Sequence, residues 1–504
     1  MIIDDQIYDV IVVGTGAGGG TIARKLADAG KKVLVLEQGE FTEKESSELT
    51  EVEVFKKEQY HAPEQWYDQD GEPFHPQTSY CVGGNTKIYS GVLMRLRERD
   101  FEEVEHKDGI SPAWGLSYGD FEPYYAEAEK LYQVHGKVDD DATEPSHSND
   151  YDFPPVERLP QLDAINQRFK DYGLHPNYLP IGIGQEGRTD SEDTGVSPAI
   201  RAGGLSEISG AARLTLKTGA TVTSIHTNPS GKVVKGVQAV IQGQAFLFVA
   251  DIVVLACGAI NSAVLLLKSA NAKHENGLGN SSGLVGRNLM KQLMTVIVEQ
   301  EPTLEDGLFQ RSLYVNDFYW GDKDFPYPMG HVQDSGGILQ DVIFSESPPL
   351  LSVAAKLLPK FGLKQLARRS LGWWLQTEDL PDSDNRVLIK KGKTYLHYKE
   401  NNLEAHDRLL YKWQQLLKAV DKEFKGTHPY ARMPISVVAH QCGTCRFGED
   451  PASSVLDLNC KMHDLDNLYV VDSSFFPSSS ATSPMLTVIA NALRVGDRLI
   501  ERLQ

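Results

Sequence analysis

The sequence predicts an α/β protein in which a parallel sheet is assembled from separated parts of the chain around an inserted α+β domain. Three observations predict this class. A β-branched run at 9–13 ends in glycines and leads into an Ala-rich helical stretch at 19–29. Two later apolar runs, 251–256 and 467–472, also lead into helical stretches. Continuous apolar runs of this length are typical of strands buried on both faces of a sheet.

These elements follow one another in the order expected of a nucleotide-binding unit. A second buried strand at 32–36 completes a strand–turn–helix–strand unit of about 30 residues. The run at 251–256 leads to an apolar helix through 265–267, and the run at 467–472 leads to a helix from about 484 to 502. We therefore expect one domain to contain 1–100, 205–300 and 430–504.

The inserted domain is expected to contain 101–204 and 301–429. Residues 136–160 are rich in Asp, Pro and Ser and predict an irregular excursion. Residues 300–370 lack periodicity and suit a loop or a cavity wall. Two short runs, 387–389 and 394–398, predict a hairpin, and apolar residues at helical spacing over 409–420 predict a helix that packs on that hairpin sheet.

Composition excludes several classes of partner. The 504 residues carry a formal net charge of −19, which repels nucleic acid and anionic lipid. The five cysteines do not form an even disulfide framework, and no apolar run reaches the length of a membrane span. The first residues lack the pattern of a secretion signal, so we expect a cytoplasmic protein, and the oligomeric state stays open.

The first strand ends in a glycine pattern that indicates dinucleotide binding. Gly14, Gly16 and Gly19 allow a tight turn, close approach of a pyrophosphate and close helix packing. The N-terminus of the helix then faces the phosphates, and Glu37 closes the second strand, where a carboxylate can bind a ribose hydroxyl. Further strand-to-glycine junctions at 83–86 and 257–259 favour the longer FAD over NAD, although a plain NAD-dependent dehydrogenase stays an alternative.

With these features, the chain resembles the glucose–methanol–choline (GMC) oxidoreductases. The resemblance rests on GTGAGGGTIARKLADAGKKVLVLEQG near the start, VGGNTKIYSGVLMRLRERDF at 82–101, DIVVLACGAINSAVLLLKSA at 251–270, LPDSDNRV at 380–387 and the C-terminal block that begins HQCGTCRFGEDP. The segment at 111–136 is most similar to pyranose oxidase-like and glycoside-oxidising bacterial members.

The resemblance implies an FAD-binding Rossmann-like domain and a substrate domain built on an antiparallel sheet, as in p-hydroxybenzoate hydroxylase. It implies that FAD contacts a set of residues from the first domain: Gly14, Gly16, Ala17, Gly18, Gly19, Glu37, Gly84, Asn85, Thr86, Val222, Gly258, Asp472 and Pro484. Pyranose oxidases often attach FAD through a histidine near the place of Ile88. Because GGNTKIYSG holds no histidine, we predict non-covalent FAD.

The resemblance also implies the catalytic residues and the reaction. His440 matches the family's active-site base, which removes the hydroxyl proton while hydride leaves the alcohol carbon. Ser483 stands where the family has histidine or asparagine; we expect it to cap the last helix, with Pro484 as the first helical residue. The expected reaction oxidises a secondary alcohol of a sugar or glycoside to a ketone, with oxygen or a quinone-like compound as final acceptor.

Several alternatives stay open. The His440–Cys442–Cys445 spacing resembles a zinc or redox cluster, although the family match explains it without metal. Asn491 could replace the missing asparagine but more commonly such a residue is structural, and Trp320, Trp373 and Trp374 could stack on a sugar or pack in a core. Because Ser483 is unusual, a lyase and a flavoprotein with weakened catalysis are the competing functions.

Overall fold

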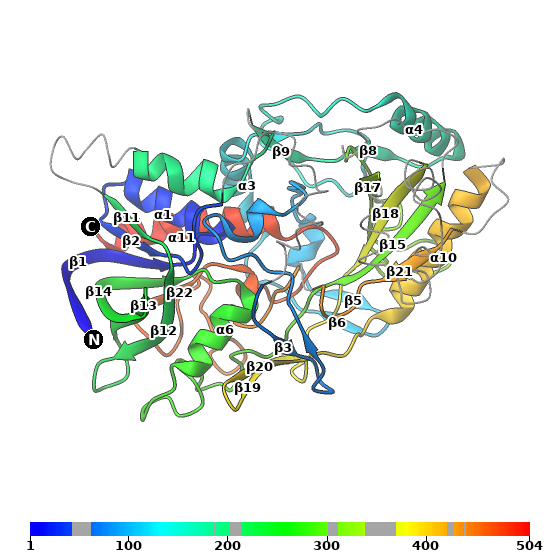
Figure 1. Cartoon of the computed structure of the whole chain (residues 1–504). Coiled ribbons are helices and arrows are strands. Elements are labelled where there is room, and N and C mark those ends of the chain that lie inside the picture. The colour runs from blue at the N-terminus through cyan, green and yellow to red at the C-terminus, as the bar shows by residue number, and fades with distance from the viewer. Residues whose placement is uncertain are drawn as a thin grey trace, which may run out of the picture.

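Two large sheets organise the protein (Figure 1). The structure is a computed structural model, and it describes residues 1–42, 62–184, 187–201, 213–300, 311–337, 369–420, 428–437 and 440–504. The expected parallel sheet and the expected antiparallel sheet are both present, which confirms the predicted fold class.

The first sheet has seven strands and brings together the start, middle and end of the chain. Its order is β11 (Leu214–Lys217), β2 (Val33–Leu36), β1 (Ile2–Val13), β14 (Gln244–Leu255), β13 (Val234–Ile241) and β12 (Ala220–Thr227), and β22 (Leu468–Val470) pairs with the end of β14. β11, β2, β1, β14 and β22 run parallel, whereas β12, β13 and β14 form an antiparallel meander. The β-branched runs of β1 and β2 are buried, as the sequence predicts.

Helices cover both faces of this sheet. α1 (Ala17–Asp28), α11 (Met485–Arg502) and α3 (Tyr118–Leu131) lie side by side on one face, and α6 (Ala259–Lys268) lies on the other (Figure 1). The junctions at 14–19 and 257–259 therefore lie at the carboxyl ends of the parallel strands β1 and β14, where open α/β sheets bind ligands. The expected strand before 83–86 is absent from the described residues there, and this segment is a loop with a 3₁₀ turn.

The second sheet has six antiparallel strands. Its order is β21 (Tyr430–Arg432), β15 (Leu293–Gln300), β18 (Ser370–Thr377), β17 (His331–Gly337), β16 (Leu313–Val315) and β8 (Pro176–Tyr178). α4 (Pro160–Tyr172) and α10 (Leu403–Val420) cover one face through a buried cluster that includes Trp373 and Trp413 (Figure 1). The described part of 300–370 thus contains strands as well as loop, while 301–310 and 338–368 lie outside the described residues.

One packing prediction was wrong. The hairpin is confirmed as β19 (Arg386–Lys390) and β20 (Lys393–His397), but α10 does not pack on it. Leu409, Trp413 and Leu417 contact the six-stranded sheet instead, because its buried face offers large apolar side chains. The hairpin joins β3 (Trp66–Tyr67) and β4 (Pro73–Phe74) in a four-stranded sheet beside α6.

The remaining elements are short. They are β5 (Val104–His106) with β6 (Gly109–Ser111); β7 (Val134–His135), β9 (Ile181–Gly184) and β10 (Gly187–Arg188); the 3₁₀ turns η1 (Gly84–Lys87), η2 (Glu98–Phe101) and η4 (Ser473–Phe475); and the π-helical η3 (Glu192–Val196). Within the described ranges, the helices are all too short or too polar to cross a membrane.

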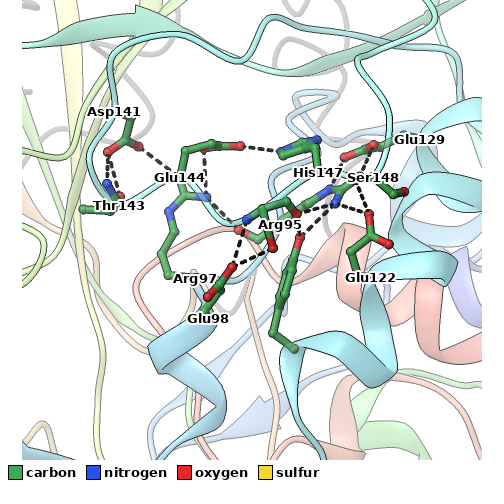
Figure 2. A network of polar contacts seen from close by, with 12 residues as sticks. Arg95, Arg97, Glu98, Glu122, Glu129, Asp141, Thr143, Glu144, His147 and Ser148 are labelled. Carbon is green, nitrogen blue, oxygen red and sulfur yellow. Dashed lines mark hydrogen bonds and ion pairs between the residues drawn. The ribbon is translucent and has the colours of Figure 1, made fainter.

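The irregular excursion at 136–160 is confirmed, and buried ion pairs hold it in place (Figure 2). Arg95 pairs with Glu129 of α3 at 2.7 Å, and Arg97 pairs with Glu144 of the excursion at 3.2 Å. Asp141, also in the excursion, accepts a hydrogen bond from Asn316 just after β16. The excursion therefore connects α3 to the six-stranded sheet.

The predicted domain ranges stay a prediction. β15 and β21 lie in the six-stranded sheet, although 293–300 and 430–432 fall within ranges assigned to the nucleotide-binding domain.

Candidate active site

The first glycine loop forms a cradle between β1 and α1. A Cβ on Gly14 would lie 2.5 Å from the Ala256 carbonyl oxygen, and one on Gly19 would lie 2.0 Å from the Gly14 carbonyl oxygen. At Gly16, by contrast, a Cβ would meet nothing within 4 Å. Gly16 precedes α1 without a side-chain cap, so no side-chain cap occupies the N–H groups of the first turn, which includes Ala17 and Gly18. This arrangement fits the pyrophosphate of a dinucleotide.

Glu37 lies at the carboxyl end of β2, beside this cradle. Its carboxylate accepts hydrogen bonds from the Thr15 N–H at 2.9 Å, from the Thr15 hydroxyl at 2.6 Å and from the Gly39 N–H at 3.0 Å. Burial raises the pKa of Glu37. The Gln38 N–H is a fourth donor to this carboxylate, so the protein itself supplies about as many hydrogen bonds as the two oxygens accept.

The second junction packs directly on the first. A Cβ on Gly84 would lie 3.2 Å from the Gly16 Cα, and the Gly83 N–H donates to the Thr15 hydroxyl at 3.0 Å. Asn85 and Thr86 shape this loop: the Asn85 side-chain oxygen accepts from the Ser79 N–H, and the Thr86 hydroxyl donates to the Gly83 carbonyl. The structure thus places both residues as loop supports around the space in front of Gly16.

The third junction is organised by Asp472. Its carboxylate accepts from the Gly258 N–H at 3.1 Å and from the Ser474 N–H at 3.0 Å, which joins the start of α6 to η4. A Cβ on Gly258 would meet nothing within 4 Å. Val222 lies in β12, two positions after Ala220, whose N–H donates to the Glu37 carbonyl at 2.8 Å. The predicted cofactor residues therefore gather along one edge of the first sheet, and their geometry fits FAD.

His440 is fixed by contacts on both sides of its segment. Cys442 exchanges two backbone hydrogen bonds with Met290, just before β15, and the Ser473 hydroxyl donates to the Gln441 carbonyl at 2.6 Å. Gly443 has φ +89°, and a Cβ there would lie 2.3 Å from the Asn288 carbonyl oxygen. The segment is thus held between the residues that lead into β15 of the six-stranded sheet and the η4 turn beside the first sheet.

The His440 ring contacts Gln292, the residue that precedes β15. Its Nδ1 lies 2.8 Å from the Gln292 side-chain oxygen, and part of His440 remains accessible. Loss of water around the ring and the nearby Lys291 cation lower the pKa of His440 to about 4. The ring is therefore neutral at pH 7 and can accept a proton.

Ser483 is buried at the end of the loop 478–483 and is linked to His440 through Gln292. The Gln292 amide nitrogen donates to the Thr482 carbonyl at 2.7 Å. The predicted cap was shifted by one residue, because α11 begins at Met485 and Pro484 occupies the capping position. Proline has no N–H and no side-chain acceptor, so its fixed φ rather than a capping hydrogen bond starts the helix.

The face of the six-stranded sheet opposite α10 carries polar and aromatic side chains. The register pairs His331 with Gln376, Gln333 with Trp374, and Tyr314 with Gln333, so these five side chains share one face. His440 contacts Gln292, which directly precedes β15. The next residue, Leu293, pairs with Thr377, the neighbour of Gln376. This face and His440 therefore border the same region, in front of the cofactor edge.

A hydrogen-bond chain fixes the orientation of His331. The Asn316 amide nitrogen donates to Asp141 at 2.9 Å, which leaves its oxygen 2.8 Å from His331 Nδ1. Burial lowers the pKa of His331 to about 4, so the neutral ring donates from Nδ1 and accepts at Nε2. The atom of Gln333 that lies 3.1 Å from Nε2 is its side-chain oxygen, so the Gln333 amide must be turned for its nitrogen to donate to the neutral ring.

The cysteine, tryptophan and Asn491 alternatives find no support in these contacts. All five cysteines are free thiols, and burial raises the pKa of Cys442 and Cys445, which opposes a reactive thiolate pair. The described residues contain no cluster of three or more metal-binding side chains. Asn491 bonds to Cys460 and Arg494 within the core.

The three tryptophans lie in the core, on the sheet face and at the wall of a small cavity beside Tyr319 and Ala481. Trp373 is buried against Phe169 and Trp413, on the α10 side. Trp374 lies on the opposite face, beside the active-site region. Trp320 stacks under Arg99, with 4.3 Å between the guanidinium carbon and the ring centre. Only Trp374 is therefore placed on the face near His440.

Comparison with known proteins decides the family. Profiles of the GMC oxidoreductases match residues 8–294 and 395–492. The chain belongs to the GMC oxidoreductase family. This enzyme is therefore an oxidoreductase acting on CH–OH donors, and FAD is the cofactor typical of the family.

Individual relatives span nearly the whole chain. The 6'''-hydroxyparomomycin C oxidase of Streptomyces lividus is 28% identical over 99% of this chain and 92% of its own length. The 2-methyl-1,2-propanediol dehydrogenase of Mycolicibacterium austroafricanum is 29% identical over 98% and 95%, and the paromamine 6'-oxidase of Streptomyces fradiae is 26% identical over 97% and 91%.

A solved structure supports the fold. Pyridoxine 4-oxidase from Mesorbium loti superposes with a TM-score of 0.69 at 18% identity, covering 97% of this GMC oxidoreductase and 99% of the other chain. At this identity the likeness concerns the fold alone.

Sequence reasoning missed Gln292, His331, Gln333, Gln376 and Asp379. Their types and spacing in the sequence carry no signal of a site, because only sheet register and loop packing bring them to His440.

Proposed function

We propose that this GMC oxidoreductase oxidises a CH–OH group of a sugar or glycoside, with hydride transfer to non-covalently bound FAD. The observation that carries the proposal is the polar sheet face beside His440. It offers amide, imidazole and aromatic groups to a ligand with several hydroxyl groups. Carbohydrate rings are recognised by this combination of hydrogen-bonding and stacking groups.

When bound, FAD supplies the acceptor for the hydride that leaves the alcohol carbon. The protein removes the remaining proton: the neutral His440 accepts the hydroxyl proton at Nε2, the ring nitrogen that does not face Gln292. The Lys291 cation near the ring disfavours a positive charge on His440. His440 therefore holds the proton only because negative charge develops on the substrate oxygen.

One acceptor oxygen is available to bind a substrate hydroxyl group. The Gln376 side-chain oxygen is buried without a hydrogen-bond partner among the described residues. A buried polar atom without a partner costs about 1–3 kcal/mol, and a substrate hydroxyl that donates to it recovers this cost. Substrates that carry further hydrogen-bond donors are therefore favoured over apolar alcohols.

The relatives favour a glycoside that carries amino groups. Two of them are named for paromomycin-type compounds, hydroxyparomomycin C and paromamine. The net charge of −19 attracts a cationic amino sugar. We propose oxygen or a quinone-like compound as electron acceptor, a cytoplasmic location, and a ketone as product where the hydroxyl is secondary.

Ser483 motivates the second candidate, a lyase or an enzyme with weakened redox activity. Its hydroxyl reaches less far than the asparagine or histidine that it replaces. Steady-state reduction of an added electron acceptor separates the oxidoreductase from the lyase, because a lyase converts substrate without reducing the acceptor.

The replacement His440→Ala tests the proposed role of the base. We expect anaerobic flavin bleaching by substrate to slow by about 10²- to 10⁴-fold, with FAD retained. His175→Ala is the matched control, because His175 is exposed and pairs with Asp317 at the surface. Unchanged bleaching in His440→Ala would show that another group takes the proton.

A further inference from the structure

Gln292 makes an unusual set of contacts at the active site. Its amide nitrogen donates to three backbone carbonyls of the loop 478–483: Ser479 at 3.2 Å, Ser480 at 3.1 Å and Thr482 at 2.7 Å. Carbonyl oxygens only accept hydrogen bonds, so the amide cannot be turned round without placing oxygen against three oxygens. The orientation of this amide is therefore fixed by its surroundings.

The fixed amide determines which nitrogen of His440 carries the proton. With the nitrogen of Gln292 committed to the loop, its oxygen faces His440 Nδ1 at 2.8 Å. An amide oxygen accepts hydrogen bonds and cannot donate, so Nδ1 must bear the hydrogen. In a neutral ring, Nε2 is then the nitrogen with the free lone pair.

The backbone of Gln292 is itself held in place. Gln292 has φ +62°, a left-handed conformation that is uncommon for a residue with a side chain. The Asp379 carboxylate accepts the N–H of Lys291 and the N–H of Gln292, each at 2.9 Å. The Ser479 hydroxyl also donates to Asp379 at 2.9 Å, so one buried carboxylate fixes both Gln292 and the loop that it binds.

The charged and titratable neighbours leave this assignment intact. Lys291, a cation beside the ring, disfavours a second proton on His440. His331 interacts with His440 and is itself neutral, since its own pKa is lowered. His440 is therefore a neutral ring whose tautomer the hydrogen bond to Gln292 decides.

We propose that Gln292 is a positioning residue, anchored by three loop carbonyls, that holds His440 as the Nδ1–H tautomer with Nε2 directed to the substrate hydroxyl. The inference deepens the proposed function and rests on it for the role of Nε2. The tautomer itself rests only on the hydrogen bonds of this chain.

The tautomer can be measured directly in the wild-type FAD-containing protein. Two-bond ¹H–¹⁵N correlation spectra of histidine-labelled protein distinguish protonated from unprotonated ring nitrogens, and His440→Ala assigns the signal by its loss. We expect His440 to show a protonated Nδ1 and an unprotonated Nε2 at pH 7. A protonated Nε2 would overturn the proposal, and this spectrum decides even if a Gln292 variant fails to fold.

Gln292→Met then tests the link to catalysis. Methionine keeps the length but removes both the acceptor for His440 and the donor to the loop carbonyls, so His440 is expected to become a mixture of tautomers, and flavin reduction at saturating substrate to slow by about 10- to 100-fold with little change in substrate affinity. Gln300→Met is the matched control, because Gln300 lies at the opposite end of β15 and bonds to Ser370.

The two experiments separate the possible failures. If Gln292→Met shifts the tautomer but His440→Ala bleaches normally, the positioning contact stands and the proposed base is wrong. If Gln292→Met changes neither tautomer nor rate, the positioning role is refuted while the base remains.

Discussion

At the residue scale, the active site depends on buried polar groups whose hydrogen bonds leave each of them a single orientation. The amides of Gln292 and Asn316 each donate to groups that only accept, namely backbone carbonyls and a carboxylate. Their oxygens therefore set the tautomers of His440 and His331. Such preorganised contacts let a base act without rearrangement during the reaction.

Asp379 offers a direct test at this scale. Its carboxylate accepts from the backbone N–H groups of Lys291 and Gln292, from the Ser479 hydroxyl and from the Tyr398 hydroxyl at 2.7 Å. In Asp379→Asn, one oxygen becomes a donor and faces other donors. We expect the free energy of unfolding to fall by about 1–3 kcal/mol, measured by urea denaturation.

The exposed Asp382 supplies the control for that variant. Asp382→Asn makes the same change of side chain three positions away, outside the buried cluster. Equal stability of Asp379→Asn and wild type would show that the cluster contributes little.

Residues tied to a local backbone motif could be predicted from the sequence, and residues joined by packing could not. Gly14, Gly16 and Glu37 follow from strand, turn and helix order, and His440 follows from the family block. Gln292 lies 148 positions from His440 and Gln376 sits in an apolar strand, so neither position is marked by its neighbours. Their roles emerge only when β15, β17 and β18 pair in register.

At the element scale, periodicity predicted α10 but not its partner. Leu409, Trp413 and Leu417 recur on one face and identify an amphipathic helix, yet the same face could pack on either sheet. The size of the facing side chains decides which sheet α10 packs on, because Trp373 and Ile297 of the six-stranded sheet complete the cluster around Trp413. The hairpin β19–β20 packs beside α6 instead.

His406 joins α10 to the six-stranded sheet, and this contact depends on pH. Its ring lies 2.7 Å from the Thr295 hydroxyl and 2.8 Å from the Thr377 hydroxyl, and burial lowers its pKa to about 3. The unfolded chain, with a pKa near 6.5, binds the proton more readily than the folded protein. Stability is therefore expected to fall as pH decreases from about 6.5 to about 3, by up to about 1.4 kcal/mol per pH unit.

Comparison with His406→Gln isolates this contribution. The variant cannot titrate, so the difference in unfolding free energy between wild type and variant should shrink or reverse as pH falls. A difference that stays constant from pH 7 to pH 4 would show that His406 does not carry the acid sensitivity.

At the scale of the whole molecule, the two sheets meet around His440, and buried charges brace the junction. The ion pairs of Arg95 and Arg97 connect α3, the excursion and, through Asp141 and Asn316, the polar sheet face (Figure 2). The seven-stranded sheet carries the first glycine loop, and the six-stranded sheet carries the polar face. We propose oxidation of a hydroxyl-bearing ring as the activity of this combination.

The rate of anaerobic flavin bleaching by wild-type enzyme tests that claim most directly. Purified FAD-containing protein would be mixed with amino glycosides, neutral sugars and small apolar alcohols, and the visible flavin band followed. We expect saturable bleaching by a sugar or glycoside, faster than by any simple alcohol, because a sugar has further hydroxyl groups that can donate to the unpartnered side-chain oxygen of Gln376. Bleaching by simple alcohols alone, or by no compound in the panel, would contradict the proposed sugar or glycoside specificity.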